Sequence, residues 1–244
     1  MQPTTIAEAP SAVRAAPVRS SVVHQVLVII AKDLRAELRT KEAVNAALAF
    51  ALTILVLFSF AFDPVEEETK MYAGGLLWIV YAFAGTLVLN RSFARELPND
   101  CLDALIAAPI SGAVLFLGKA LANYLLVMAV ELVSLPIFGI FYYVHWYDHF
   151  WQMMLVLALG TWGITVIGTM FSALTINIRL REVMLPLLTY PMLVPALMAS
   201  MQLTVDLVNG RVIGSDPAWI RVLVSFDIIY TAAALFLVEI VLVG

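Results

Sequence analysis

Long uninterrupted apolar runs constrain this chain more than any other feature of its sequence. Six runs can be marked along the 244 residues: 44 to 62, 72 to 90, 113 to 143, 151 to 176, 184 to 204 and 219 to 243. A helix needs about 20 apolar residues to cross the hydrocarbon core of a bilayer, and every run approaches or exceeds that length. Barrel strands would instead alternate apolar with polar residues. With 62% hydrophobic and 13% charged residues, the chain is predicted to be an all-α membrane protein with six transmembrane helices.

The third run is longer than one perpendicular crossing requires. Its first turns, around Gly118 and Lys119, are expected to continue from the cytoplasmic surface, so that the membrane part begins near Leu121. Pro136 is a candidate bend within it. The run is therefore counted as a single span.

Positive residues are shared unevenly between the two sides of the predicted bundle. Most lie before the first span, between the second and third, or between the fourth and fifth: Arg14, Arg19, Lys32, Arg35, Arg39, Lys41, Arg91, Arg95, Lys119, Arg179 and Arg181. The other side has Lys70, Arg211 and Arg221, beside the acidic stretch DPVEEETK. Because positive residues are retained on the cytoplasmic side, both termini are predicted to be cytoplasmic.

The segment before the first span divides into two parts. Residues 1–20 are rich in Ala, Pro and Ser, lack the apolar run of a signal peptide, and are interpreted as a disordered tail. A cleaved organelle-targeting peptide is the alternative, which Glu8 and the modest Arg content disfavour.

Residues 21–43 have a helical pattern. Apolar residues fall near one face: Val26, Ile29, Ile30, Leu34 and Leu38. Charged residues lie largely elsewhere: Lys32, Asp33, Arg35, Arg39 and Lys41. This pattern predicts an interfacial helix whose basic residues meet anionic headgroups, although an ordinary surface helix needs almost the same pattern. The six-helix transmembrane domain is then predicted to occupy residues 44–244.

A polar, acid-bearing segment separates the second and third runs. It reads ARELPNDCLDALIAAPIS, from Ala94 to Ser111. Its apolar residues at helical spacing are Leu102, Leu105 and Ile106. Asn99 or Asp100 is a candidate N-cap and Pro109 ends the pattern, which predicts a short amphipathic helix at about 99–109. Such a helix can fit a groove on a soluble partner, lie on the membrane, or pack against its own neighbours, and periodicity leaves these alternatives open.

Four stretches, in this order, carry a resemblance to a known family. The part NRSFARELPNDCLDALIAAPISGAVLFLGKALAN resembles the segment by which ABC-2-type permeases turn from their second span through a coupling helix into a lysine-bearing third span. The other three stretches are FDPVEEETKMYAGGLLWIVYAFAGTLVLNRSFARE, LGTWGITVIGTMFSALTINIRLRE and MLPLLTYPMLVPALMAS. Together they resemble the CcmB family, the permease subunits of the haem-handling ABC complex in cytochrome c maturation. The similarity runs from about Val26 to the end of the chain.

The resemblance implies a non-catalytic subunit of the bacterial inner membrane that docks a separate ATPase, CcmA. The docking residues that it implies are Arg95, Glu96, Asp100, Leu102, Asp103, Leu105, Ile106 and Pro109. It also implies CcmC and CcmD as membrane partners and the haem chaperone CcmE as the client. ATP would lie on the ATPase, haem would be handled by the complex, and no cofactor or nucleic acid is expected on this chain.

The sequence has no G-x-x-x-x-G-K-[ST] phosphate loop, which agrees with the expectation that a separate subunit binds ATP. An ABC-2-type exporter for another substrate, such as a drug or lipid, is the first alternative function. A membrane-embedded enzyme is the second.

Three acids lie inside apolar runs, where insertion scales assign a cost of about 2.5 to 3.5 kcal/mol to an acid such as Asp at mid-helix. They are Glu131, Asp227 and Glu239. Either interhelical hydrogen bonding or a role in conduction or proton relay would explain them. Glu131 is the deepest by register, and we expect it to bond a hydroxyl such as Ser134 or Tyr124 in its own helix, or a partner subunit.

Spans four and five carry further candidate features. Small residues that allow close helix approach are Gly160, Gly163, Gly168 and Ser172. Kink candidates are Pro186, Pro191 and Pro195. In the loop VHWYDHFW, His145 and His149 invite a haem-ligand interpretation, but the aromatic residues beside them are typical of an interfacial belt. No metal site is predicted.

Overall fold

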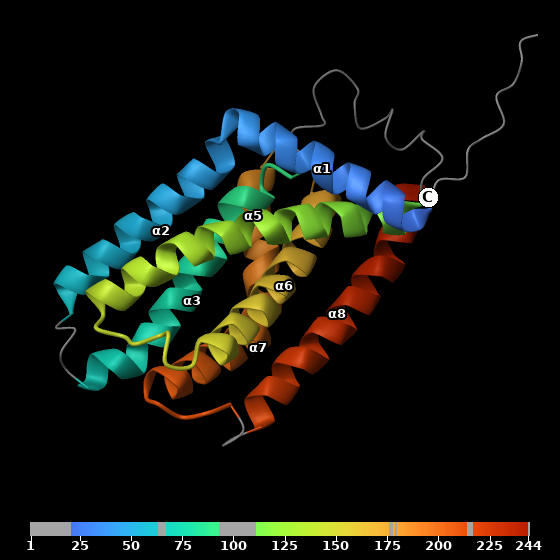
Figure 1. The fold of residues 1–244 in the computed structure, drawn as a ribbon. Coiled ribbons are helices and arrows are strands. Elements are labelled where there is room, and N and C mark those ends of the chain that lie inside the picture. Colours follow the sequence, from blue (N-terminus) through green and yellow to red (C-terminus); the bar gives the residue numbers. More distant parts are fainter. Residues whose placement is uncertain are drawn as a thin grey trace, which may run out of the picture.

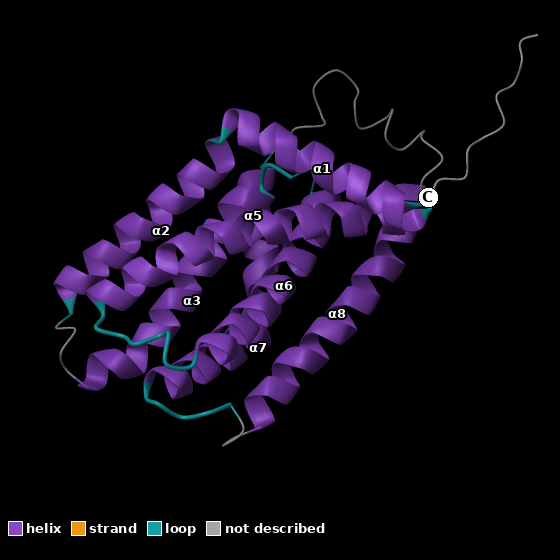
Figure 2. Cartoon of the chain, viewed as in Figure 1, coloured by secondary structure: helices purple, strands orange, loops and turns teal. Residues whose placement is uncertain are grey.

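The structure is a computed structural model that describes residues 21–62, 67–92, 111–175, 178, 180–213 and 217–243. All regular elements in these ranges are helices, as Figure 2 shows. Their bounds are α1 Val22–Thr40, α2 Glu42–Ala61, α3 Glu67–Leu89, α5 Gly112–Phe141, α6 Phe150–Leu174, α7 Arg181–Val208 and α8 Pro217–Val243 (Figure 1).

Among the described residues, six helices are long and apolar enough to cross a membrane: α2, α3, α5, α6, α7 and α8. They coincide with the six predicted runs; the largest differences are at α3, which begins at 67 and not at 72, and at α7, which extends beyond 184 to 204 at both ends. The prediction of an all-α chain with six candidate spans is therefore confirmed. The side of the membrane that each end faces stays a prediction.

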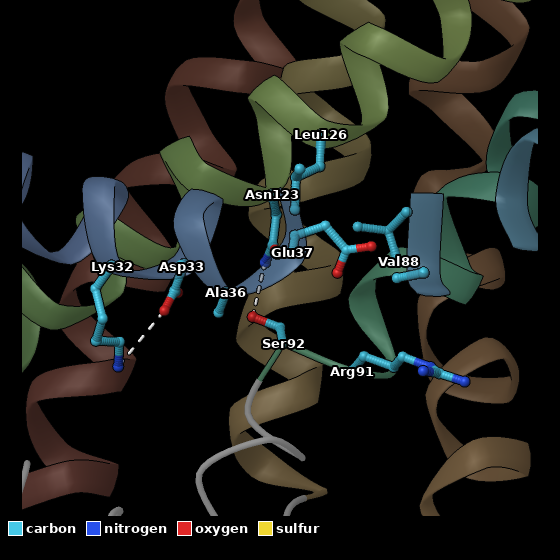
Figure 3. Close-up of a pocket in the computed structure, with 10 residues that line it drawn as sticks. Lys32, Asp33, Ala36, Glu37, Val88, Arg91, Ser92, Asn123 and Leu126 are labelled. Carbon is cyan, nitrogen blue, oxygen red and sulfur yellow. Dashed lines mark hydrogen bonds and ion pairs between the residues drawn. The ribbon is translucent and has the colours of Figure 1, made fainter. Parts of the chain in front are cut away.

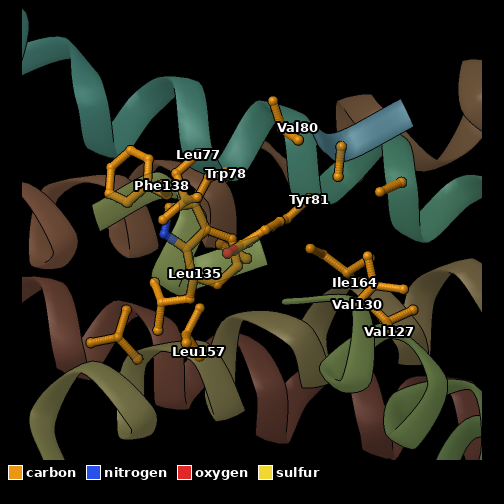
Figure 4. Packing of buried hydrophobic residues seen from close by; sticks show 14 of the residues in the cluster. Leu77, Trp78, Val80, Tyr81, Val127, Val130, Leu135, Phe138, Leu157 and Ile164 are labelled. Carbon is orange, nitrogen blue, oxygen red and sulfur yellow. The ribbon is translucent and has the colours of Figure 1, made fainter. Parts of the chain in front are cut away.

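The two innermost helices are α3 and α6. Within the span of each, 72% of the residues are buried, compared with 22% in α2 and in α8. Trp78 and Tyr81 of α3 are fully buried and pack among aliphatic side chains of α5 and α6 (Figure 4). A Cβ at Gly160 of α6 would overlap the indole of Trp78, so the glycine permits this close crossing.

Helix α1 meets α2 at a sharp corner. Lys41 joins them with φ 55°, the left-handed conformation in which α1 ends. Oε1 of Glu37 accepts a hydrogen bond of 2.9 Å from the backbone N–H of Val44, and so satisfies one of the free amides at the start of α2. The corner therefore directs α1 away from the axis of α2 (Figure 1).

The aliphatic residues of α1 are divided between two surroundings. Val26 and Ile29 pack against Val114 and Leu115 in the first turn of α5. Leu38, predicted on the same face, is 67% exposed. The part of this face with Val26 and Ile29 thus packs on α5, and the part with Leu38 is exposed. The interfacial placement of α1 stays a prediction.

The first turns of α5 are covered by α1. The side chain of Lys119 is fully buried, and a Cβ at Gly118 would come within 2.7 Å of Ile29 of α1. The start of the membrane part near Leu121 stays a prediction. Both proline-bearing spans are continuous helices: α5 runs through Pro136, and α7 runs through Pro186, Pro191 and Pro195.

Candidate functional site

The predicted docking helix lies outside the described residues. This applies to Arg95, Glu96, Asp100, Cys101, Leu102, Asp103, Leu105, Ile106 and Pro109. The residues on either side of that segment, Ser92 and Ser111, are described. The candidate site is therefore built from the side chains that hold these two points.

A buried ion pair lies beside Ser92. Lys119 Nζ of α5 is 3.2 Å from Asp33 Oδ2 of α1 and donates a hydrogen bond of 3.1 Å to the backbone carbonyl of Ser92. A buried ammonium group requires such partners, because desolvation penalises an uncompensated charge by several kcal/mol. The pair therefore fixes α1 and α5 to the residue that follows the last turn of α3.

One side-chain amide, of Asn123, and one hydroxyl, of Ser172, add to this attachment. Nδ2 of Asn123 donates a hydrogen bond of 2.9 Å to Ser92 Oγ (Figure 3). It donates another of 2.9 Å to Thr169 Oγ1 of α6. Oγ of Ser172, also on α6, donates a bond of 3.0 Å to the carbonyl of Leu89 at the end of α3. The Leu89 carbonyl also accepts a hydrogen bond of 3.1 Å from the backbone N–H of Ser92, so α6 adds a second donor to it. We call Asp33, Ser92, Lys119 and Asn123 the junction.

An exposed ion pair links the same end of α3 to α2. Arg91 Nη1 pairs with Glu42 Oε2, and their side chains are 46% and 63% exposed. Exposed pairs stabilise a protein by about 0 to 1 kcal/mol, so removing this contact should cost less than removing one partner of the buried pair. A cavity of about 250 Å³ lies between these groups, with Lys32, Asp33, Glu37 and Arg91 in its wall (Figure 3).

The residue that follows segment 93–110, Ser111, is held at the start of α5. Ser111 is the N-cap of this helix, and its Oγ accepts a hydrogen bond of 3.3 Å from the N–H of Val114. Val114 in turn packs on Ile29 of α1. Both flanks of residues 93–110 are thus held by α1 and α5.

A second polar group lies deeper in the bundle, around Glu131 of α5. Its side chain is fully buried, and Oε2 accepts a hydrogen bond of 2.5 Å from Thr161 Oγ1 of α6. Tyr81 of α3 donates through its hydroxyl to the backbone carbonyl of Glu131 at 3.3 Å. The expectation of Ser134 or Tyr124 as the carboxyl's partner is wrong: Ser134 Oγ bonds Tyr81 and backbone carbonyls, and the carboxyl's partner is on a neighbouring helix.

The other two intramembrane acids differ from Glu131. Asp227 of α8 is 7% exposed and approaches α6 at Gly163, where a Cβ would lie 3.0 Å from Oδ1. Neither carboxylate oxygen of Asp227 has a hydrogen-bond partner within the described part of the chain. Glu239 lies in α8, with its side chain outside the described residues.

The two histidines of the loop between α5 and α6 lie outside the core. His145 is exposed, with its ring edge-on to Tyr147, and His149 precedes α6. Within the described ranges, no three His, Cys, Asp or Glu side chains gather closely enough to hold a metal ion.

Sequence reasoning did not find the junction. The available signal was a lysine inside an apolar run, Lys119, together with an acid, Asp33, on the preceding amphipathic helix. A second signal was the spacing of hydroxyl residues in span four: Thr161, Thr165, Thr169 and Ser172.

Comparison with known proteins supports the family resemblance. Residues 24–241 match the family model described as "CcmB protein". "Heme exporter protein B" of Rhodobacter capsulatus is 31% identical over 175 residues, which cover 72% of this chain and 80% of that protein. The protein of the same description from Paracoccus denitrificans is 30% identical over 191 residues, covering 78% and 84%. The chain belongs to the CcmB family.

Proposed function

We propose that this chain is the non-catalytic permease subunit of an ABC transporter complex in cytochrome c maturation. It couples ATP hydrolysis by a separate ATPase, CcmA, to haem handling or to release of the haem-loaded chaperone CcmE. CcmC and CcmD are its membrane partners in the bacterial inner membrane, and both termini are cytoplasmic. ATP lies on the ATPase and the chain binds no cofactor directly. Membership of the CcmB family and the six candidate spans support this assignment.

The observation that carries the proposal is the attachment of Ser92, which directly precedes the segment proposed to dock the ATPase. Its backbone carbonyl and hydroxyl accept hydrogen bonds from Lys119 and Asn123. Through these side chains the end of α3 is connected to α1, α5 and α6. A displacement of residues 93–110 therefore acts on several helices together rather than on α3 alone.

Energy considerations favour movement of the junction as a unit. Hydrogen bonds to charged groups contribute about 1.5 to 3 kcal/mol each, and separating a buried ion pair costs more. Closure of two ATPase subunits is the proposed source of the displacement, and the docking helix at about 99–109 is the proposed lever. The spans transmit the movement, while the chemistry of ATP stays on the partner.

Docking is tested by exchanging Asp103 and Leu105 together for Arg. The double variant reverses one charge and removes one apolar contact on the proposed docking face, so the ATPase should no longer copurify with the detergent-solubilised complex. Tyr147→Arg is a matched control, because Tyr147 is 58% exposed in the loop between α5 and α6. Unchanged copurification with the double variant would rule out docking through this face.

The proposed cytoplasmic position of the lever is tested with Cys101, the only cysteine of the chain. A membrane-impermeant maleimide should label Cys101 in permeabilised cells and leave it unlabelled in intact cells. ATP-dependent release of the haem-loaded chaperone from the purified complex then tests coupling itself. Labelling of Cys101 in intact cells would place the segment on the wrong side for an ATPase.

A further inference from the structure

One face of α6 carries a row of buried hydroxyl groups. They belong to Thr161, Thr165, Thr169 and Ser172, at intervals of four, four and three residues, which place them on the same side of a helix. All four residues are buried. One end of this hydroxyl row meets the junction, and the other end meets Glu131.

The contacts at its two ends involve other helices. At the junction, Ser172 donates to the carbonyl of Leu89 and Thr169 accepts from Asn123. At the opposite end, Thr161 donates to Oε2 of Glu131. Only Thr165, in the middle, bonds backbone carbonyls of α6 itself, at Thr161 and Trp162. The row thus connects two polar groups that belong to separate parts of the bundle.

The spacing of the row suits proton transfer through hydroxyls and intervening water. Positions four residues apart are separated by about 6 Å along a helix. One water molecule with two hydrogen bonds of about 2.8 Å each can bridge that separation. Each hydroxyl can accept a proton on a lone pair while it releases its own, so no group in the row needs to change its charge permanently.

Glu131 is the group to which such a path leads. The side chain is fully buried, and its Oε1 has no hydrogen-bond partner among the described residues. Because an ionised carboxylate in an apolar interior is costly, Glu131 must hold a proton unless a cation or water compensates it. Among the described residues, the titratable groups that interact with it are Tyr81 of α3 and Tyr124 of α5, and Tyr124 also faces Asp227 of α8. None of these is a base that pairs with a carboxylate.

On the side of Glu131 away from the junction, the hydroxyls of Ser134 and Tyr81 come first, and they bond each other and the backbone of α5. Leu135 and Phe138 lie one and two turns beyond Glu131 on α5, and Leu157 lies one turn from Thr161 on α6; all three are buried in the central core (Figure 4). The hydroxyl row of α6 therefore connects the carboxyl of Glu131 to the junction, whereas toward the loop between α5 and α6 apolar side chains follow Ser134 and Tyr81.

We propose that Glu131 is a proton-binding site that exchanges its proton with the junction end of the bundle along the hydroxyl row of α6. One oxygen of the carboxylate takes up one proton, delivered through the row, and the neutral acid returns it by the same route. The site requires no ATPase, so this inference stands independently of the proposed function.

Infrared difference spectroscopy of the chain in lipid nanodiscs tests the binding site. A step in the pH of the buffer should change the C=O stretching band of a protonated carboxyl, and Glu131→Gln should lose that band. Infrared absorption does not require a reagent to reach the buried group. A Glu131 band that does not change across the pH range in which the protein stays folded would overturn the proposal, because the carboxyl would then be only a fixed hydrogen-bond partner.

Time-resolved measurement after a pH jump tests the path. Thr165→Val and Thr169→Val replace a hydroxyl by a methyl group of similar size and should slow the change of the Glu131 band, whereas Thr165→Ser should keep the native rate. Thr189→Val is the matched control, since Thr189 is a buried threonine of α7 outside the row. Equal rates in the row variants and the control would overturn the assigned route.

Discussion

The two ends of the helix bundle are held together in different ways. At the junction, Asp33 of α1, Ser92 after α3, and Lys119 and Asn123 of α5 are joined by an ion pair and hydrogen bonds, and Asn123 also bonds Thr169 of α6. At the other end, α2, α3 and α7 surround an apolar groove of about 650 Å³, whose wall includes Phe58, Tyr72 and Met201. Hydrogen bonds fix both distance and direction, whereas apolar contacts are non-directional. The groove end also has single hydrogen bonds, such as that of 3.1 Å from the Tyr142 hydroxyl to the Leu55 carbonyl, so the difference is that the junction joins its helices around a buried charge and the groove end around an apolar wall.

The largest effect is expected from Asp33→Ala. Because it removes the carboxylate that lies 3.2 Å from the buried Lys119, it should destabilise the protein by about 3 kcal/mol, the lower part of the range for a broken buried pair, since Asp33 is partly exposed. Thermal unfolding in detergent, followed by size-exclusion chromatography, measures the loss.

The control for that prediction removes both charges. Asp33→Leu combined with Lys119→Met should recover most of the stability, because apolar replacement of a buried pair is often neutral. A double variant as unstable as the single one would show that charge pairing is not what holds the junction.

A smaller effect is expected toward the groove end from Thr204→Val. This change removes the acceptor of the buried hydrogen bond of 2.9 Å from Trp78 Nε1. An indole N–H left buried without a partner should cost about 1 to 3 kcal/mol, measured by the same thermal assay. Thr231→Val is matched to it, since Trp162 Nε1 donates to Thr231 at 3.0 Å in a partly buried position. Equal losses for the two variants would contradict the role assigned to burial.

The smallest effect is expected from Glu42→Gln. The Arg91 pair that it removes is exposed to solvent, so the free energy of unfolding should fall by less than about 1 kcal/mol. The difference from the native chain should shrink further in high salt, because exposed charges are screened. A salt-independent loss as large as that of Asp33→Ala would remove the distinction between the exposed Arg91–Glu42 pair and the buried Lys119–Asp33 pair.

The sequence predicted the spans well because bilayer thickness sets the length of an apolar run, and that constraint is local. The junction is not local: Lys119 and Asp33 are 86 residues apart, and Glu131 and Thr161 are 30 apart. The first turns around Lys119 were predicted to continue from the cytoplasmic surface because the run is longer than one crossing requires, and this reasoning says nothing about which helix packs on them. Only the packing of α1 over α5 shows that this position is covered.

The corner at Lys41 has a consequence for how the first helix meets a lipid surface. A lysine with φ 55° adopts a backbone conformation that costs an L-residue roughly 1 to 2 kcal/mol, and Glu37 braces it by holding the amide of Val44. The angle between α1 and α2 is thus set by the backbone of Lys41 and the hydrogen bond of Glu37, before α1 contacts any lipid headgroup. A bilayer would therefore not have to orient this helix.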